Sequence, residues 1–221
     1  MCITTTTLKR MCKGESMKEI LISIKPQWVE KILNGEKTIE IRKTKPSCDL
    51  PVKVYIYCTK SKKTGNEWTD GMTLGYDNYN RIRFCNYNDE NQLMNGKVVA
   101  EFTLNKVDTI FICDPDILLN GQQKHWTWFK NKSCLDCEQL MSYIGYGNDH
   151  DGWGREWDKG YAWHIDNLKI YDKPKELGNF KHFKKYDWWD FGHHTNKPVR
   201  ELESFVKPPQ SWSYIEKVEE K

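Results

Sequence analysis

The sequence predicts a mixed α+β domain in which strands outnumber helices. Short runs of β-branched and aromatic residues recur along the chain, a pattern typical of strands. One stretch near the N-terminus has apolar residues at helical spacing instead. Long stretches rich in glycine, asparagine and aspartate separate these segments and indicate loops. A chain of 221 residues can hold one large domain or a small domain with insertions.

The expected domain spans residues 17–216, between a leader at 1–16 and a short tail at 217–221. The leader is rich in threonine and lacks the apolar run of a secretory signal, so we expect a disordered leader, with an upstream in-frame extension as the alternative. Long polar segments inside the domain are expected to be loop insertions, at residues 59–95, 145–160 and 179–205.

The domain is expected to open with a strand followed directly by a helix. Alternating isoleucines predict a strand over residues 19–25, and Pro26 suits the first turn of a helix. Apolar residues spaced three and four apart then predict a helix over residues 27–34. Gly35 is placed to end that helix in a left-handed conformation.

The segment after this helix combines charge and apolar residues in strand alternation. Ile39 and Ile41 are expected to face the core, while Glu40 and Arg42 share the opposite face. Strict alternation would put Lys37 on the isoleucine face, where an ammonium group is unfavourable. We therefore expect Lys37 to lie in the preceding turn, with its amine near Glu40. An ordinary solvated edge strand with ion pairs is the alternative.

Gly35, Lys37, Glu40 and Arg42 together form a motif that resembles the signature of ASCH domains, in the PUA-like superfamily of small β-barrels. Flanking blocks of the chain resemble the same family in order, at residues 20–26, 96–102, 161–165 and 208–212. The last two blocks resemble ASCH proteins of bacteria and their phages. The resemblance implies a PUA-like β-barrel with flanking helices and long loop insertions.

The other expected elements follow in order. β-branched and aromatic runs predict further strands, at residues 52–58, 80–84, 97–104, 107–112 and 161–171. A helix is expected from an N-cap at Ser133 to Ile144, with a turn or short helix near residues 174–177. Residues 205–215 are expected to close the barrel.

The charged motif is the expected ligand-binding site. Arg42 is permanently charged and can hold a phosphate or a carboxylate with two parallel hydrogen bonds. Glu40 can accept from the exocyclic amine of cytosine or guanine. The resemblance implies RNA or a nucleotide-like ligand in this cleft. The binding set is Lys37, Thr38, Glu40 and Arg42, and the resemblance adds His164 because the block around it recurs in the family.

An enzyme is the second hypothesis, with Lys37 and Glu40 as catalytic residues. Some small ASCH members hydrolyse N4-acylated cytidine with a threonine nucleophile that a lysine activates, aided by a later carboxylate. In this chain Glu40 occupies the threonine position, and the later carboxylate falls near Glu138, so the pattern departs from that of the hydrolases. Phosphodiester cleavage by the same charged cleft, as in a ribonuclease, is another enzymatic reading. A protein-interaction module that uses aromatic loops is a third hypothesis.

Composition narrows the classes of binding partner and the compartment that we expect for this protein. A net charge of +3 is too small to indicate tight nonspecific binding to nucleic acid. No apolar run reaches the ~18 residues of a membrane span. The eight cysteines are scattered and no export signal precedes them, so we expect reduced thiols and a cytoplasmic protein. The oligomeric state stays open.

Three further features each have a structural explanation that competes with a functional one. Cys134 and Cys137 have a metal-binding spacing but lack a second pair of ligands, so we expect no metal and no cofactor. The pair His193 and His194 is expected to be a solvated loop feature. The aromatic and basic segment 180–191 suits two roles equally well. Its aromatic rings could stack on unpaired bases, or they could pin a loop over the domain.

Overall fold

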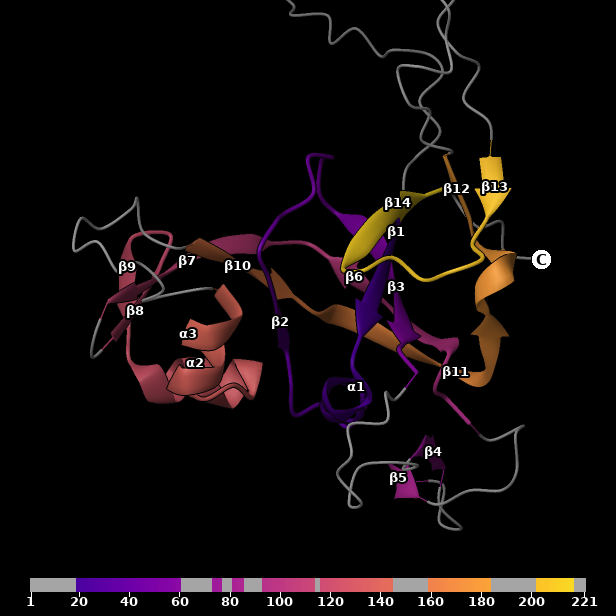
Figure 1. Cartoon of the computed structure of the whole chain (residues 1–221). Coiled ribbons are helices and arrows are strands. Elements are labelled where there is room, and N and C mark those ends of the chain that lie inside the picture. The colour runs from indigo at the N-terminus through magenta and orange to yellow at the C-terminus, as the bar shows by residue number, and fades with distance from the viewer. Residues whose placement is uncertain are drawn as a thin grey trace, which may run out of the picture.

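The computed structural model describes residues 19–60, 73–76, 81–85, 93–113, 116–144, 159–183 and 202–216. Within these residues the chain forms two five-stranded sheets, two short two-stranded sheets, three α-helices and one 3-10 helix (Figure 1). The expected mixed α+β class is confirmed. The leader at 1–16, the tail at 217–221 and most of the three expected insertions lie outside the described residues.

The first sheet has the strand order β11-β6-β3-β1-β14. Its strands are β1 (Glu19–Ile24), β3 (Val52–Cys58), β6 (Lys97–Leu104), β11 (Asp166–Glu176) and β14 (Trp212–Ile215). β1 and β3 run parallel, and the other neighbours are antiparallel. The parallel pair requires a crossover, and the crossover contains the first helix and the charged motif.

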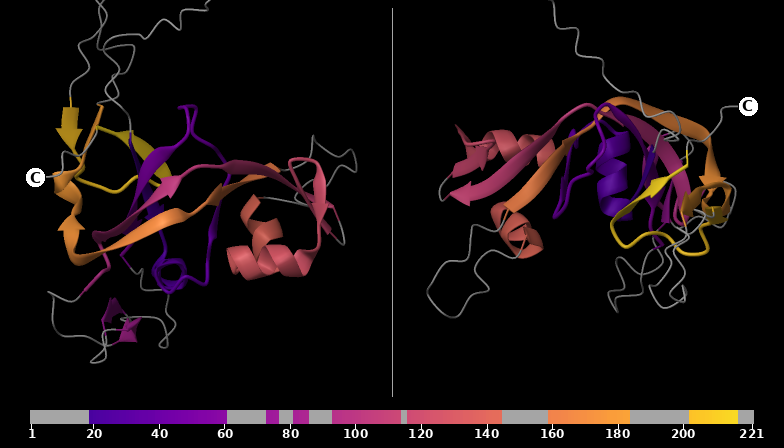
Figure 2. Two further views of the ribbon diagram at one scale, coloured as in Figure 1. Left: turned by 180° about the vertical axis from the view of Figure 1, so that it is seen from behind. Right: turned by 90° about the horizontal axis from the view of Figure 1, so that it is seen from above.

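The second sheet has the order β2-β10-β7-β8-β9. Its strands are β2 (Ile39–Arg42), β7 (Val107–Cys113), β8 (Asp116–Leu119), β9 (Gln122–Lys124) and β10 (Lys159–His164). β6 and β7, like β10 and β11, follow one another in the chain and carry it from one sheet into the other (Figure 2). The single strand expected at residues 161–171 is therefore two strands. The break lies where Ile165 donates its N–H to Thr38 and Asn167 takes a positive φ of 50°.

The expected closed barrel is not found among the described residues. β14 pairs with β1, β2 pairs with β10, and no ladder joins the edges of β2 and β14. Only residues 212–215 of the segment expected to close the barrel form a strand of the sheet. The outer edge of β2 instead meets α2, where Thr38 donates its N–H to the carbonyl of Lys132. We call the junction between β2 and the β1–β14 edge the seam.

α1 (Pro26–Leu33) covers the interior face of the first sheet. Its buried residues Val29, Ile32 and Leu33 pack with the inward residues of β1 and β3. Asn34 caps the helix, and Gly35 follows with a φ of 76°, as the sequence predicts for the residue that ends a helix. A hairpin of β4 (Thr73–Tyr76) and β5 (Ile82–Cys85) lies beside this helix (Figure 1).

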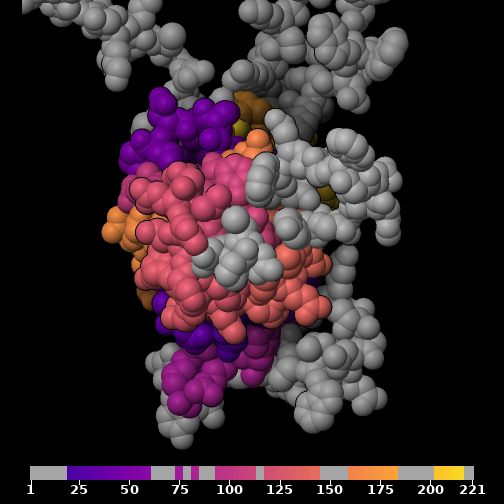
Figure 3. Space-filling view, turned by 90° about the vertical axis from the view of Figure 1, so that its left-hand side faces the viewer, coloured from indigo at the N-terminus to yellow at the C-terminus, as the bar shows by residue number. Residues whose placement is uncertain are grey.

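α2 (Trp126–Ser133) and α3 (Cys137–Ile144) cover the face of the second sheet that carries Ile39 and Ile41. Residues 116–144 therefore make up much of the molecular surface in the view of Figure 3. The expected helix from Ser133 to Ile144 is wrong at its start, because Ser133 ends α2. Asp136 caps α3 instead: its carboxylate accepts from the N–H of Gln139 at 2.8 Å, and the Gln139 side chain accepts from the N–H of Asp136 at 3.1 Å. This reciprocal pair is a capping box.

The outer face of the first sheet is covered by η2 (Leu177–Asn179), β12 (Lys181–Phe183) and β13 (Leu202–Ser204). Phe180 is buried there and meets the ring of Tyr55 edge-on at 5.1 Å. This contact favours the pinned-loop reading for the start of segment 180–191, whose later part lies outside the described residues. Within the described part of the chain, every helix is too short or too polar to cross a lipid bilayer.

Candidate functional site

The two faces of β2 divide as the sequence predicts. Ile39 and Ile41 are buried in the core formed with α2 and α3. Glu40 and Arg42 share the other face, where Glu40 pairs in register with the buried Trp163. That face looks toward the interior beside the first sheet, and not toward solvent. Glu40 and Arg42 are each only 6% exposed, so the expected half-buried strand is buried on both faces.

Lys37 lies in the turn between α1 and β2, as predicted, and is 2% exposed. Its ammonium donates to the carbonyl of Ser133 at 2.5 Å, at the end of α2. It also lies 3.4 Å from Oε2 of Glu40 and 5.4 Å from the centre of the Trp28 ring. The carbonyl end of a helix, a carboxylate and an aromatic face all favour a cation at this position.

Arg42 spans the seam. Its Nη2 donates to the backbone carbonyl of Ser23 in β1 at 2.8 Å and lies 3.1 Å from Oε1 of Glu40. Its Nη1 donates to Oγ of Ser211 at 3.3 Å. Ser23 is itself tied to the segment before β14, because its hydroxyl donates to the carbonyl of Pro209 at 2.6 Å. One guanidinium thus connects three separate segments of the chain.

Two polar atoms of this cluster lack a hydrogen-bond partner among the described residues. They are Oε2 of Glu40, an acceptor, and Nε of Arg42, a donor, and both are buried. The Lys37 ammonium nevertheless lies 3.4 Å from Oε2 and forms an ion pair with it. Buried polar atoms are paired in the great majority of cases, so one unpaired acceptor and one unpaired donor in the same cluster need an explanation.

Burial alters the acid–base behaviour of the cluster. Desolvation lowers the pKa of Lys37 below its usual 10.5, although the charge of Glu40 and its contact with the amine act in the opposite direction. The net effect is that Lys37 releases its proton more readily than a solvated lysine does. A buried amine of this kind can donate a hydrogen bond when protonated and accept a proton when neutral.

Aromatic side chains surround the charged cluster. Trp28 stands over Lys37, and Trp163 lies next to Glu40 across the strand pair. Trp212 meets the Trp163 ring at 5.5 Å, and its indole N–H donates to the hydroxyl of Thr44, just beyond β2. The set offers aromatic rings beside a carboxylate, a guanidinium and an amine, which is the chemistry that recognises a planar polar ligand.

The remaining predicted residues lie apart from this cluster. Thr38 is half-buried, and its backbone joins β2 to Lys132 and to Ile165. Glu138 is exposed in the first turn of α3. His164 stands opposite Ile39 in the strand pair, so its side chain belongs to the isoleucine face and not to the Glu40 face.

His164 belongs to a second polar cluster, centred on the buried Asp108. Its Nε2 lies 2.7 Å from Oδ2 of Asp108, which also receives the Lys106 ammonium at 2.9 Å. Asn120 donates to Oδ1 of the same carboxylate at 2.6 Å. Burial alone raises the pKa of Asp108, but the hydrogen bonds from Lys106 and His164 outweigh it and bring the pKa below its usual value. We regard this cluster as a structural tie at the bend between the two sheets.

Cys48, Cys58, Cys134 and Cys137 are free thiols. Cys134 follows α2 with a left-handed φ of 56°, and Cys137 begins α3, where its thiol contacts the sulfur of Met141. No group of three or more His, Cys, Asp or Glu side chains within the described residues is placed to hold a metal ion.

Sequence reasoning missed the partners that enclose the charged cluster. Ser23, Ser133 and Ser211 carry no chemical signature. Ser23 and Ser133 act through their backbone carbonyls, and Ser211 acts through its hydroxyl. The blocks of resemblance at residues 20–26 and 208–212 contain Ser23 and Ser211, but they did not mark either serine as a partner of the cluster. A separate pocket between α1 and β5 was also missed, because its two arginines come from a hairpin inside an expected loop.

Comparison with known proteins returns structural matches only. No family model matches the chain, and no curated protein matches it. The crystal structure of an ASCH protein from Zymomonas mobilis is similar, with 16% identity and a TM-score of 0.46, over 90% of this chain and 87% of that chain. A point-substituted form of the same protein matches with 15% identity and a TM-score of 0.47, over 90% of this chain and 89% of that chain.

These matches are to the domain type that the sequence resemblance predicts.

Proposed function

We propose that this chain is an ASCH-type protein that binds a nucleotide-like ligand, as a free nucleoside or as a base of single-stranded RNA, at Lys37, Glu40 and Arg42. The observation that carries the proposal is a pair of buried atoms without a hydrogen-bond partner among the described residues: Oε2 of Glu40, which has the Lys37 ion pair at 3.4 Å, and Nε of Arg42. They offer one acceptor and one donor, and the edge of cytosine or guanine offers the complementary amine donor and ring or carbonyl acceptor.

The energetics of the cluster support a role beyond stability. A buried ion pair rarely stabilises a fold more than well-packed apolar residues of similar size would. Here three charged side chains are buried together and two of their polar atoms are left without hydrogen bonds. A ligand that satisfies both atoms would recover the hydrogen-bond free energy that the unliganded cluster lacks.

The surroundings suit a base more than a bare phosphate. Trp28 is partly exposed and provides flat apolar surface beside the cluster, whereas Trp163 is buried next to Glu40. Glu40 would also repel an anion placed next to it. The cluster is also almost closed to solvent, so binding requires that contacts across the seam open. We therefore expect association slower than the usual range of about 10⁵–10⁷ M⁻¹s⁻¹.

The test is nucleoside binding followed by tryptophan fluorescence, with cytidine and uridine compared on the same protein. Uracil carries a carbonyl where cytosine carries its exocyclic amine, so cytidine should bind more tightly if Glu40 accepts from that amine. Glu40→Gln should remove most of the difference, about 10- to 100-fold in affinity for a hydrogen bond to a charged group. Glu36→Gln is the matched control. Equal affinity for cytidine and uridine would exclude the proposed site. The site would also be excluded if the protein bound none of cytidine, uridine, guanosine and short single-stranded RNAs.

Hydrolysis is a second candidate, favoured by one observation: desolvation lowers the pKa of Lys37 below its usual 10.5, so its amine gives up a proton more readily than that of a solvated lysine. The test is incubation with N4-acetylcytidine and with a short RNA, with detection of free acetate and of cleaved strands. We expect binding without turnover. Acetate release or strand cleavage that Lys37→Met abolishes would instead establish an enzyme.

A further inference from the structure

The segment that leaves β2 lies at the surface, directly after Arg42. It is tied to the strand on the other side of the seam, because the indole N–H of Trp212 in β14 donates to the hydroxyl of Thr44 at 3.0 Å. We call residues 43–48 and 207–214 together the rim. The rim thus brings two segments that are far apart in the sequence to the end of the seam that Arg42 spans.

The rim is basic. Lys43, Lys45 and Lys207 are exposed, and the rim contains neither aspartate nor glutamate. Within the described part of the chain, no carboxylate lies within ion-pair distance of these three ammonium groups. Because the whole chain has a net charge of only +3, three uncompensated cations in the rim are a local concentration of positive charge.

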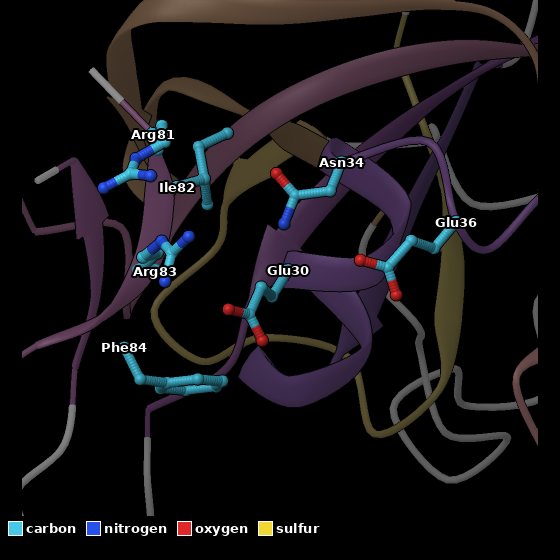
Figure 4. A pocket seen from close by; sticks show the side chains of 7 residues that line it. All are labelled: Glu30, Asn34, Glu36, Arg81, Ile82, Arg83 and Phe84. Carbon is cyan, nitrogen blue, oxygen red and sulfur yellow. The ribbon is translucent and has the colours of Figure 1, made fainter. Parts of the chain in front are cut away.

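The pocket of about 430 Å³ between α1 and β5 has a different arrangement of charge (Figure 4). Arg81 and Arg83 on β5 stand opposite Glu30 and Glu36, and each of the two arginines already has an interaction partner. Opposed and compensated charges attract a polyanion less than cations without carboxylate partners do. The rim, and not this pocket, is therefore the surface suited to an anionic partner.

Aromatic rings accompany the lysines of the rim. The Lys43 ammonium lies 5.7 Å from the centre of the Tyr143 ring, and the Lys45 ammonium lies 5.6 Å from the centre of the Tyr161 ring. Tyr143 is 37% exposed, and Tyr161 and Trp212 are partly exposed. Proteins hold unpaired nucleotides with this combination, because bases stack on the rings while cations meet the phosphates.

The same tyrosines connect the rim to the buried cluster. Tyr161 pairs in register with Arg42 on neighbouring strands. Desolvation raises the pKa of Tyr143; the charge of Arg42 lowers that pKa and the charge of Glu40 raises it, so the Tyr143 hydroxyl lies within electrostatic reach of both side chains. A base bound at Glu40 and Arg42 would therefore have its sugar and phosphates at or near the rim.

We propose that the cluster takes a base within single-stranded RNA, and that Lys43 and Lys45 hold the phosphates on either side of that base. This inference rests on the proposed function and decides between the free nucleoside and the RNA that it leaves open. A free nucleoside carries no phosphate and would leave the lysines of the rim without a partner. An acidic peptide would pair with these lysines but has no base for Glu40 and Arg42.

The test compares cytidine with the single-stranded pentanucleotide UUCUU, which offers the same cytosine with phosphates on both sides, by tryptophan fluorescence of the full chain. Each phosphate contact that releases counterions contributes about fivefold at 0.1 M salt, so two contacts should make the pentanucleotide bind about 25-fold more tightly than cytidine. The logarithm of its affinity should fall with the logarithm of the salt concentration with a slope of about −1.4, or about −0.7 for each contact. The slope for cytidine should be near zero.

Variants assign the phosphate contacts. Lys43→Gln combined with Lys45→Gln should lower the affinity for the pentanucleotide by about 25-fold and bring its salt slope close to zero. The matched control is Lys130→Gln combined with Lys132→Gln, which removes two exposed lysines with the same spacing on α2. The control should bind the pentanucleotide within about twofold of the parent. An equal loss in both double variants would overturn the assignment of the phosphates to the rim.

The remaining outcomes separate this inference from the proposed function. If cytidine and the pentanucleotide bind equally and Glu40→Gln weakens both, the inference is wrong and the proposed nucleoside site stands. If the pentanucleotide needs Lys43 and Lys45 but is indifferent to Glu40→Gln, the proposed base site is wrong. Hexaglutamate binding as tightly as the pentanucleotide, with the same loss in the rim variant, would show an acidic peptide as the partner and overturn the inference. Binding of neither cytidine nor the pentanucleotide would overturn both.

Discussion

Replacing Glu40 with glutamine tests whether the charged cluster is one coupled buried unit. The side chain keeps its size and shape, but two buried cations lose their shared counter-charge. Glu40 lies 3.4 Å from the Lys37 amine and 3.1 Å from Nη2 of Arg42. At an effective dielectric constant of about 20, each contact has a gross Coulomb energy of roughly 5 kcal/mol, most of which the desolvation of the ions offsets.

The net loss expected from Glu40→Gln is about 3–5 kcal/mol in the free energy of unfolding, the usual result of removing one partner of a buried pair. The loss should lie near the lower end because Lys37 can release its proton, its pKa being already lowered by burial. For the same reason the destabilisation should shrink as the pH rises above neutral. Urea-induced unfolding measured by far-UV circular dichroism gives the difference.

Glu36→Gln provides the matched control for this measurement. Glu36 also pairs with a lysine, at 3.2 Å, but its side chain is 56% exposed. Exposed pairs contribute about 0–1 kcal/mol, so this variant should unfold almost as the parent does. If Glu40→Gln costs no more than Glu36→Gln, the cluster is not a coupled buried network and the reasoning above fails.

Three further outcomes follow from the pKa shifts. Burial lowers the pKa of Lys37 in the folded state from its usual 10.5, so between that lowered value and 10.5 the folded state binds fewer protons than the unfolded state. The free energy of unfolding should therefore rise with pH up to about pH 10.5. Lys37→Met should remove that rise in urea-unfolding curves. The pKa of Asp108 in the folded state lies below 3.8, so the stability that this carboxylate contributes is present above pH 3.8 and is lost as the pH falls through the folded value. Asp108→Asn should lower the free energy of unfolding by about 1–3 kcal/mol at neutral pH and flatten the acid unfolding curve. Burial raises the pKa of Cys58 to about 12, so iodoacetamide at pH 8 should modify the exposed Cys137 but leave Cys58 unmodified until the protein unfolds, as peptide mass spectrometry would show.

The strands that sequence patterns predicted best are those whose environment is uniform along their length. β1, β3 and β6 contain β-branched or aromatic runs and lie inside the first sheet, buried along most of their length. Local pattern and tertiary environment agree in these strands, so the pattern suffices. β8 and β9 are short, and their pairing depends on the turn at Asn120 and Gly121, both of which have positive φ.

The helix α2 shows why local pattern fails elsewhere. Its sequence begins with two tryptophans around a threonine, residues that are poor helix formers. His125 caps it by accepting from the N–H of Thr127, which is a less common cap than serine, threonine or aspartate. Burial of Phe129 against the second sheet stabilises the helix, and that contact is invisible in the sequence.

The candidate site was predictable in part for a similar reason. Lys37, Glu40 and Arg42 are neighbours in the chain, so strand alternation and the preceding turn were enough to bring them together. Their burial was not predictable. Ser23 lies 19 residues before Arg42 and Ser211 lies 169 residues after it, so the enclosure depends on how β1 and β14 are arranged.

The position of Arg42 links the fold to the proposed function. Apolar residues at the seam would join β2 to the edge of β1 and β14 with less desolvation, and such a junction would stay closed. Arg42 joins them through hydrogen bonds to Ser23 and Ser211, and each acceptor can be exchanged for water or for a ligand. Within the described part of the chain its Nε has no hydrogen-bond partner, and Oε2 of Glu40 has none besides its ion pair with Lys37. A seam held by exchangeable contacts around an unsatisfied donor and acceptor is what a site that opens to admit a polar ligand requires.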